Sequence, residues 1–302
     1  KGISMANTTE TVVLEPKKTI GERLTKLGSE AGKYRRLATG GIVLVILIVT
    51  AFSADLWIPY DPTKADFDST LQPPSGTHIM GTDRLGRDVF ARVVYGSRIS
   101  LFIGVGAVAF TSVMGVCMGV VSGYLGGKVD TVIMRIVDAF MAFPSLILAM
   151  VIAFALGPSL FNIALALAIT RGPHFSRLVR GQVLALRERD FILAARAIGT
   201  PDIAIMYRHL LPHITTLVAV YASLLAGSMI FAESSLAFLG LGVPPPTPTW
   251  GAMLGAGVPD LELAPWVSLF PGAAVTFAVL GFNFMGDGMR DLLDPLIRNI
   301  KK

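Results

Sequence analysis

The chain of 302 residues carries 26 basic and 21 acidic side chains, which give a net charge of +5. A soluble protein of this length carries roughly 75 charged residues, so a chain with 47 is poor in charge. Its apolar share of 53% and its mean hydropathy of +0.63 exclude intrinsic disorder, and its single cysteine excludes a disulfide framework or a cysteine-based metal site. The composition predicts a protein that spans a lipid bilayer.

Residues 1–39 are polar and basic and are predicted to form a cytoplasmic amino-terminal tail, in which the residues before Met5 are interpreted as a remnant ahead of the natural start. An apolar run follows, and residues 40–60 are predicted to form the first transmembrane helix with Asp55 as its one charge. A cleaved signal peptide would not follow so long a polar region, so this helix is expected to stay in the mature protein.

Residues 61–97 are polar, contain several prolines and are predicted to form a periplasmic segment, with charges from Arg84 to Arg92 spaced like one helix face. Residues 99–127 carry no charge and predict the second transmembrane helix. Within this run, glycines at four-residue spacing predict a close helix–helix seam, although unspecific membrane glycines are the alternative. They are Gly115, Gly119 and Gly123.

Four further transmembrane helices are predicted, at 131–156, from 161 onward, at 214–238 and at 263–286. The first of them contains Arg135 and Asp138, which are three residues apart and are expected to pair on one helix face. The second is apolar only in its first half and is expected to emerge into the cytosol along its basic second half. Together with the second transmembrane helix they form a predicted five-helix core, residues 98–289, followed by a cytoplasmic tail, 290–302.

The basic residues are distributed unequally between the two sides of the predicted bundle. Of the 26, 21 fall on the same side as the amino terminus and 5 on the other. Because cytoplasmic segments of membrane proteins are enriched in Lys and Arg, both termini are predicted to be cytoplasmic. This distribution accounts for the basic character of the chain without nucleic acid.

Residues 185–213 form a charged cytoplasmic loop that a bare membrane anchor would not need. Its alanine-rich part, Asp190–Ile198, predicts a short helix with the aspartate at its positive end. Gly199 is predicted to end this helix in the left-handed conformation.

A second short helix is predicted directly after this glycine. Thr200 is expected to cap it, and Pro201 is expected to lie in its first turn. The helix is expected to run to about Leu210, where Pro212 halts it. Two short helices meeting at a glycine would form a compact knob.

This loop resembles the Glu-Ala-Ala loop of ABC importer permeases through Ala194-Ala195, Gly199 and Leu211-Pro212, although Leu193 and His209 stand where the family has glutamate and isoleucine. Longer stretches are similar to the dipeptide/oligopeptide/nickel permease family, in particular to its C-type subunit. They are Gly81–Asp88, Phe238–Gly251 and Gly286–Pro295.

The resemblance implies an all-α membrane protein with six transmembrane helices, the type I ABC importer permease fold, and a cytoplasmic coupling helix. It implies the bacterial inner membrane, a homologous permease as partner, two ATPase subunits or domains, and an extracytoplasmic substrate-binding protein. The residues implied to couple to the ATPases are Ala194, Ala195, Gly199, Thr200, Pro201, Leu211 and Pro212.

The sequence contains no phosphate-binding loop, no dinucleotide-binding glycine motif and no zinc-protease motif, so the chain is predicted to be a non-catalytic subunit that binds no cofactor or metal itself. ATP and Mg²⁺ are expected on the partner ATPases. The expected cargo is a small peptide. The alternatives are nickel or another metal chelate, glutathione or an opine in the same machine, a stand-alone secondary transporter, and an intramembrane enzyme.

Glu233 is an ionisable residue inside a predicted transmembrane helix, which makes it a candidate functional residue by default. It would contact a peptide's amino terminus or act as a gate of the pore. A structural acid near the outer end of the helix is an equally weighted alternative.

Overall fold

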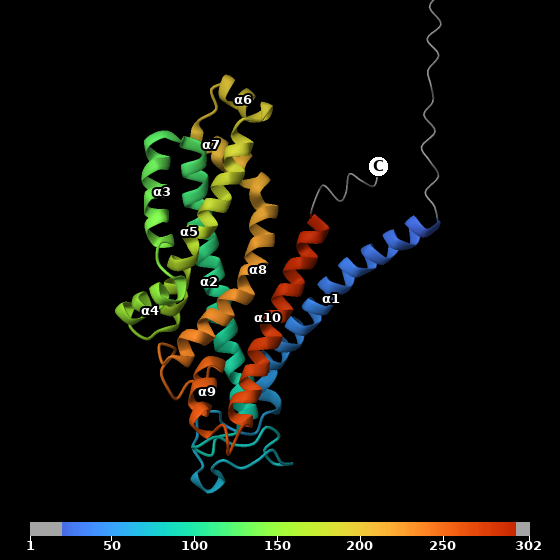
Figure 1. The fold of residues 1–302 in the computed structure, drawn as a ribbon, viewed down its shortest axis with the longest axis vertical. Helices are drawn as coiled ribbons and strands as arrows, with labels where there is room; N and C mark the ends of the chain where they lie inside the picture. Colours follow the sequence, from blue (N-terminus) through green and yellow to red (C-terminus); the bar gives the residue numbers. More distant parts are fainter. Residues whose placement is uncertain (1–19, 294–302) are drawn as a thin grey trace, which may run out of the picture.

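The computed structural model describes residues 20–293, and within this range every regular element is helical (Figure 1). The ten α-helices are α1 Ile20–Trp57, α2 Val89–Leu125, α3 Gly127–Met141, α4 Ser145–Leu156, α5 Leu160–Arg187, α6 Asp190–Ala197, α7 Asp202–Ile205, α8 Leu211–Phe238, α9 Trp250–Gly257 and α10 Trp266–Leu293. The short α6 and α9 lie at opposite ends of the long helices (Figure 1). Residues 1–19 and 294–302, which belong to the two predicted tails, lie outside the described residues.

The first helix begins at Ile20, inside the region predicted as a tail, and its apolar part is Arg35–Trp57. It runs along α10, and the backbones approach so closely that a Cβ on Gly40 would lie 2.5 Å from the amide nitrogen of Met285. Near its other end, Asp55 accepts hydrogen bonds from Arg98 and Tyr95 of α2, at 2.9 Å and 2.8 Å. These partners explain how an acid is tolerated at the end of an apolar helix.

The glycine seam predicted in α2 is confirmed, and its partner is α5. A Cβ on Gly115 would lie 2.8 Å from Phe175, and one on Gly119 would lie 2.6 Å from the carbonyl oxygen of Ser176. A Cβ on Gly123 would lie 3.0 Å from Val183. Because glycine leaves no side chain between the two backbones, α2 and α5 pack along most of their length.

The helix predicted over 131–156 is broken into α3 and α4, whose axes are bent by 95°. Pro144 lies at the break, and a proline disfavours helical geometry in the residue before it. Between residues 20 and 293, four helices are long and apolar enough to cross a membrane, and the bent pair would be a fifth. The fourth predicted transmembrane helix corresponds to α5, which lies in the bundle but carries four arginines, so composition alone does not mark it as a membrane span.

The predicted pairing of Arg135 with Asp138 is wrong. Asp138 pairs instead with Arg177 of α5, and Asp130 receives two hydrogen bonds of 2.6 Å from Arg180 of the same helix. Both carboxylates of α3 are therefore paired with arginines of a neighbouring helix. The basic half of α5 is thus held against α3 over two ion pairs.

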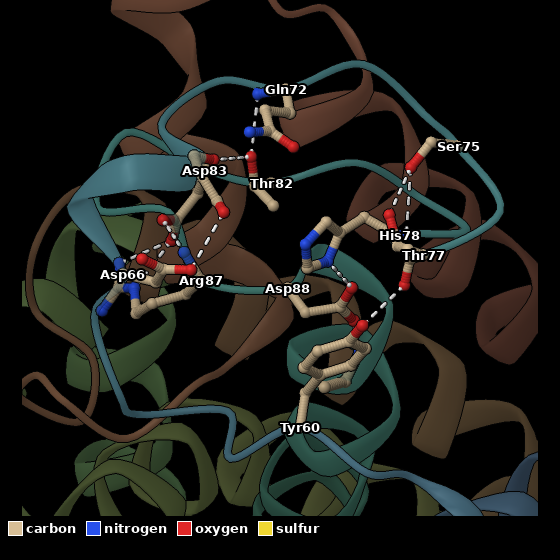
Figure 2. Close-up of polar contacts among 12 residues, drawn as sticks. Tyr60, Asp66, Gln72, Ser75, Thr77, His78, Thr82, Asp83, Arg87 and Asp88 are labelled. Atoms are coloured by element: carbon tan, nitrogen blue, oxygen red, sulfur yellow. Dashed lines mark hydrogen bonds and ion pairs between the residues drawn. The ribbon is translucent and has the colours of Figure 1, made fainter.

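Residues 58–88 form a cap at the α9 end of the bundle (Figure 1), and Figure 2 shows the polar contacts among its side chains. The prediction that the charges from Arg84 to Arg92 lie on one helix face is wrong for the first of them, because α2 begins only at Val89. Asp88 is the N-cap of this helix, and its carboxylate also lies 2.9 Å from Nδ1 of His78. The loop before it is organised by Asp83, whose side chain is 8% exposed and is paired with Arg87 at 2.7 Å.

The cap is fastened to the segment between α8 and α10, which contains α9. Arg84 donates a hydrogen bond of 2.5 Å to Asp260, and the indole of Trp266 donates one of 3.1 Å to the carbonyl oxygen of Thr82. The fully buried Trp250 opens α9 and donates from its indole to the carbonyl oxygen of Val93, at 2.9 Å. Segments that are far apart in the sequence therefore form one layer at this end of the bundle.

Candidate functional site

The loop between α5 and α8 folds as predicted into two short helices that meet at a glycine. Gly199 has a φ of +79°, and its amide nitrogen donates to the carbonyl oxygen of Arg196 at 2.9 Å. The amide nitrogen of Thr200 donates to the carbonyl oxygen of Ala195 at 3.0 Å. These two bonds form a Schellman motif, which ends α6 and turns the chain sharply into α7.

Two details of the predicted loop are wrong. Thr200 does not cap α7, because the helix begins one residue later with Pro201 at the N-cap position and no side-chain cap. Pro212 does not halt the second helix either, because α7 continues through a π-helical turn, Met206–Leu210, into α8. A π turn adds one residue to the helical repeat and so accommodates a proline ring that a regular α-helix would exclude.

One face of the loop is packed against the membrane helices. Ile192 of α6 and Ile205 of α7 are fully buried, and Ala195 is 5% exposed. They share a core with Val179 and Val183 of α5. The burial of these apolar side chains fixes the loop to the end of the α2–α5 pair.

The loop also carries large apolar side chains that are exposed. We name the four most exposed of these side chains the knob surface: Leu193, Ile198, Ile203 and Tyr207, which are 46%, 82%, 77% and 71% exposed. The loop also carries charged residues at Arg189, Asp190 and Arg208, all exposed, which place it in water rather than in hydrocarbon. Large apolar side chains exposed to water on a folded loop indicate a protein contact.

The seven residues that the resemblance assigned to coupling fall into two groups in the structure. Five of them lie at the α6–α7 corner: Ala194, Ala195, Gly199, Thr200 and Pro201. Leu211 and Pro212 instead open α8, past the π turn. The residue that sequence reasoning missed is Tyr124, at the end of α2, which contacts both short helices.

Glu233 lies in α8 and is 1% exposed. One carboxylate oxygen accepts a hydrogen bond of 3.3 Å from Ser234, and the other has no hydrogen-bond partner among the described residues. Ser100 of α2 lies beside the carboxylate, and its hydroxyl accepts from the amide nitrogen of Trp250 at 3.3 Å. Glu233 is therefore at the junction of α2, α8 and α9.

Comparison with known proteins places this arrangement in a family. Residues 115–299 match the family described as binding-protein-dependent transport system inner membrane component. The chain belongs to this family, whose members are permease subunits of ABC importers.

Relatives of known name extend the likeness over most of the chain. A glutathione transport system permease protein GsiD of Pectobacterium atrosepticum is 41% identical over 260 residues, 86% of each chain. A dipeptide transport system permease protein DppC of Alkalihalophilus pseudofirmus is 42% identical over 268 residues, 88% of each chain. The GsiD protein of Escherichia coli O157:H7 is 43% identical over 261 residues, 86% of each chain. The predicted dipeptide/oligopeptide family and C-type subunit are confirmed.

Proposed function

We propose that this chain forms, with a homologous permease, the translocation path of an ATP-driven importer, and that the knob surface docks on an ATPase subunit. The exposure of four large apolar side chains on a water-facing loop carries the proposal. The orientation follows, with the α6 end in the cytoplasm and the cap and α9 outside. The bias of basic residues toward the α6 side supports it.

The proposed cargo is a small peptide. Two kinds of relative support it, since their names give dipeptides and glutathione, which is itself a tripeptide. In this proposal an external binding protein delivers the peptide, and ATP and Mg²⁺ are bound by the ATPases alone. Nickel chelates and opines are the alternative cargoes, and the ligands that copurify with the native binding protein distinguish them.

The variant I203D tests the docking role of the knob surface. Ile203 is 77% exposed, so an aspartate there is expected to leave the fold of the chain intact. At the centre of a protein interface the same charge would be buried without a partner, which costs several kcal/mol. We expect the ATPases to be lost from the purified complex and peptide uptake to fall to background.

The matched control for this test is I203L, which keeps an apolar side chain of the same size and is expected to retain the ATPases. Copurification of I203D with a normal complement of ATPases and with normal uptake would rule out the proposed docking surface. Peptide uptake by the chain alone, without any ATPase, would favour the stand-alone transporter.

Glu233 is proposed to be part of an outer gate and not a ligand of the peptide, because its carboxylate is buried where α2, α8 and α9 meet. We expect E233Q to lower uptake about ten-fold, the size of effect seen when a hydrogen bond to a charged group is lost. The thermal midpoint of the complex should stay unchanged, because glutamine has the same shape. Wild-type uptake in E233Q, combined with unfolding of E233A, would identify a structural acid.

A further inference from the structure

We infer that Tyr124 is a positioning residue that transmits movement of the coupling loop to α2. Tyr124 is the penultimate residue of α2 and is 4% exposed. Its partners on the loop are 72 and 78 residues further along the chain, so only the fold brings them together. The inference rests on the proposed coupling function of the loop and adds the residue through which the coupling acts.

A single phenol group contacts both short helices of the loop. Its hydroxyl donates a hydrogen bond of 2.7 Å to the carboxylate of Asp202, the first residue of α7. The guanidinium of Arg196, in the last turn of α6, lies over the aromatic ring at 4.8 Å, and its Nε donates to the phenol oxygen at 3.4 Å. The phenol therefore joins a cation on one helix to an anion on the other. Hydrogen bonds to charged groups are stronger than those between neutral groups.

The hydrogen bonds of Tyr124 connect the loop to α2, a helix that does not directly precede or follow the loop in the chain. The loop is continuous with α5 at one end and, through the π turn, with α8 at the other. The buried side chains of Ile192 and Ile205 hold the loop to the bundle, but apolar contact is non-directional. The hydrogen bonds of Tyr124 instead fix the orientation of α6 and α7 relative to α2.

The glycine seam between α2 and α5 means that a movement passed from the loop to α2 also reaches α5. Because the glycines of α2 bring its backbone against α5, the two helices move together when one of them is displaced. A push on the knob surface is then delivered to the pair as a whole. Without the phenol, the same push would tilt the loop on its apolar base before it moved α2.

The test uses the complete complex of both permeases, the ATPases and the binding protein, reconstituted in proteoliposomes with glutathione and the dipeptide Ala-Ala as probes. We expect Y124F to lower the number of peptides taken up per ATP hydrolysed by about ten-fold, because it removes the hydroxyl and keeps the ring. ATPase copurification and the thermal midpoint are expected to match the wild type. A lesion that is merely structural would lower the thermal midpoint as well.

Y221F is the matched control, because Tyr221 stacks on Phe175 at 4.7 Å in the same region and its hydroxyl makes no hydrogen bond among the described residues. It is expected to keep the wild-type ratio of uptake to hydrolysis. D202N is expected to weaken the same bond, so Y124F and D202N combined should lower the ratio little further than either alone.

An unchanged ratio in Y124F, or losses that add fully in the double variant, would overturn the inference. Loss of the ATPases from Y124F would also overturn it, because Tyr124 would then shape the docking surface rather than transmit movement. Failure of the proposed function looks different. If the proposed function is wrong, I203D keeps its ATPases and its uptake. If only the role of Tyr124 is wrong, I203D is inactive and Y124F has the wild-type ratio of uptake to hydrolysis.

Discussion

Replacing Gly119 with valine is expected to prevent the chain from forming a stable complex. The Cβ alone would lie 2.6 Å from both the carbonyl oxygen of Ser176 and the Cβ of Val179. Overpacking of a protein core costs about 1–3 kcal/mol, and the cost here is greater because a backbone carbonyl cannot rotate aside. Gel filtration after extraction from membranes should show the monodisperse complex reduced several-fold.

The control for this variant is G181A, on the other helix of the same seam. A Cβ on Gly181 meets nothing within 4 Å, and alanine is the better helix former. The complex carrying G181A should therefore be recovered in at least the wild-type amount. Recovery of G119V at that level would mean that α2 and α5 are not packed through the glycines.

Replacing Asp83 with alanine is expected to open the cap. This carboxylate accepts from the amide nitrogens of Leu85 and Arg87, at 2.9 Å and 3.0 Å, and pairs with the guanidinium of Arg87. Arg92, whose side chain is 8% exposed, lies 3.5 Å away. Removing one partner of a buried ion pair costs about 3–5 kcal/mol, so the thermal midpoint should fall by about 10 °C.

Limited digestion with trypsin reports directly on this change. The D83A cap should be cut after Arg84 and Arg87 under conditions in which the wild-type cap stays intact. D61A is the control, because Asp61 is exposed and accepts hydrogen bonds from Thr63, two residues further along the chain. Equal resistance of D83A and D61A to trypsin would show that Asp83 does not hold the cap together.

The apolar runs of the sequence were sufficient to predict most of the long helices and the seam between two of them. Helix breaks were harder to predict, because the effect of a proline depends on its surroundings. Pro144 marks a bend of 95°, while Pro212 lies in a helix that continues through a π turn. The partner of Asp138 was also misassigned, since a neighbour on its own helix is visible in the sequence and Arg177 on another helix is not.

The candidate site was predictable where it depends on local structure. A glycine after an alanine-rich segment predicts a helix end, and Gly199 adopts the required conformation. Tyr124 gave no such signal, because a tyrosine at the end of an apolar helix is common and its partners on the loop are remote in the sequence. Which side chains of the loop are exposed also depends on how the two short helices pack, and this is a property of the tertiary structure.

The π turn at Met206–Leu210 sets the direction in which the knob surface points. Each residue of an α-helix turns the chain by about 100°, and a π turn holds one residue more than the regular repeat. Loss of a single residue from this turn would therefore swivel α7 by about a quarter of a revolution around the axis of α8. Ile203 would then point in another direction, so the length of this one turn determines which way the proposed docking surface faces.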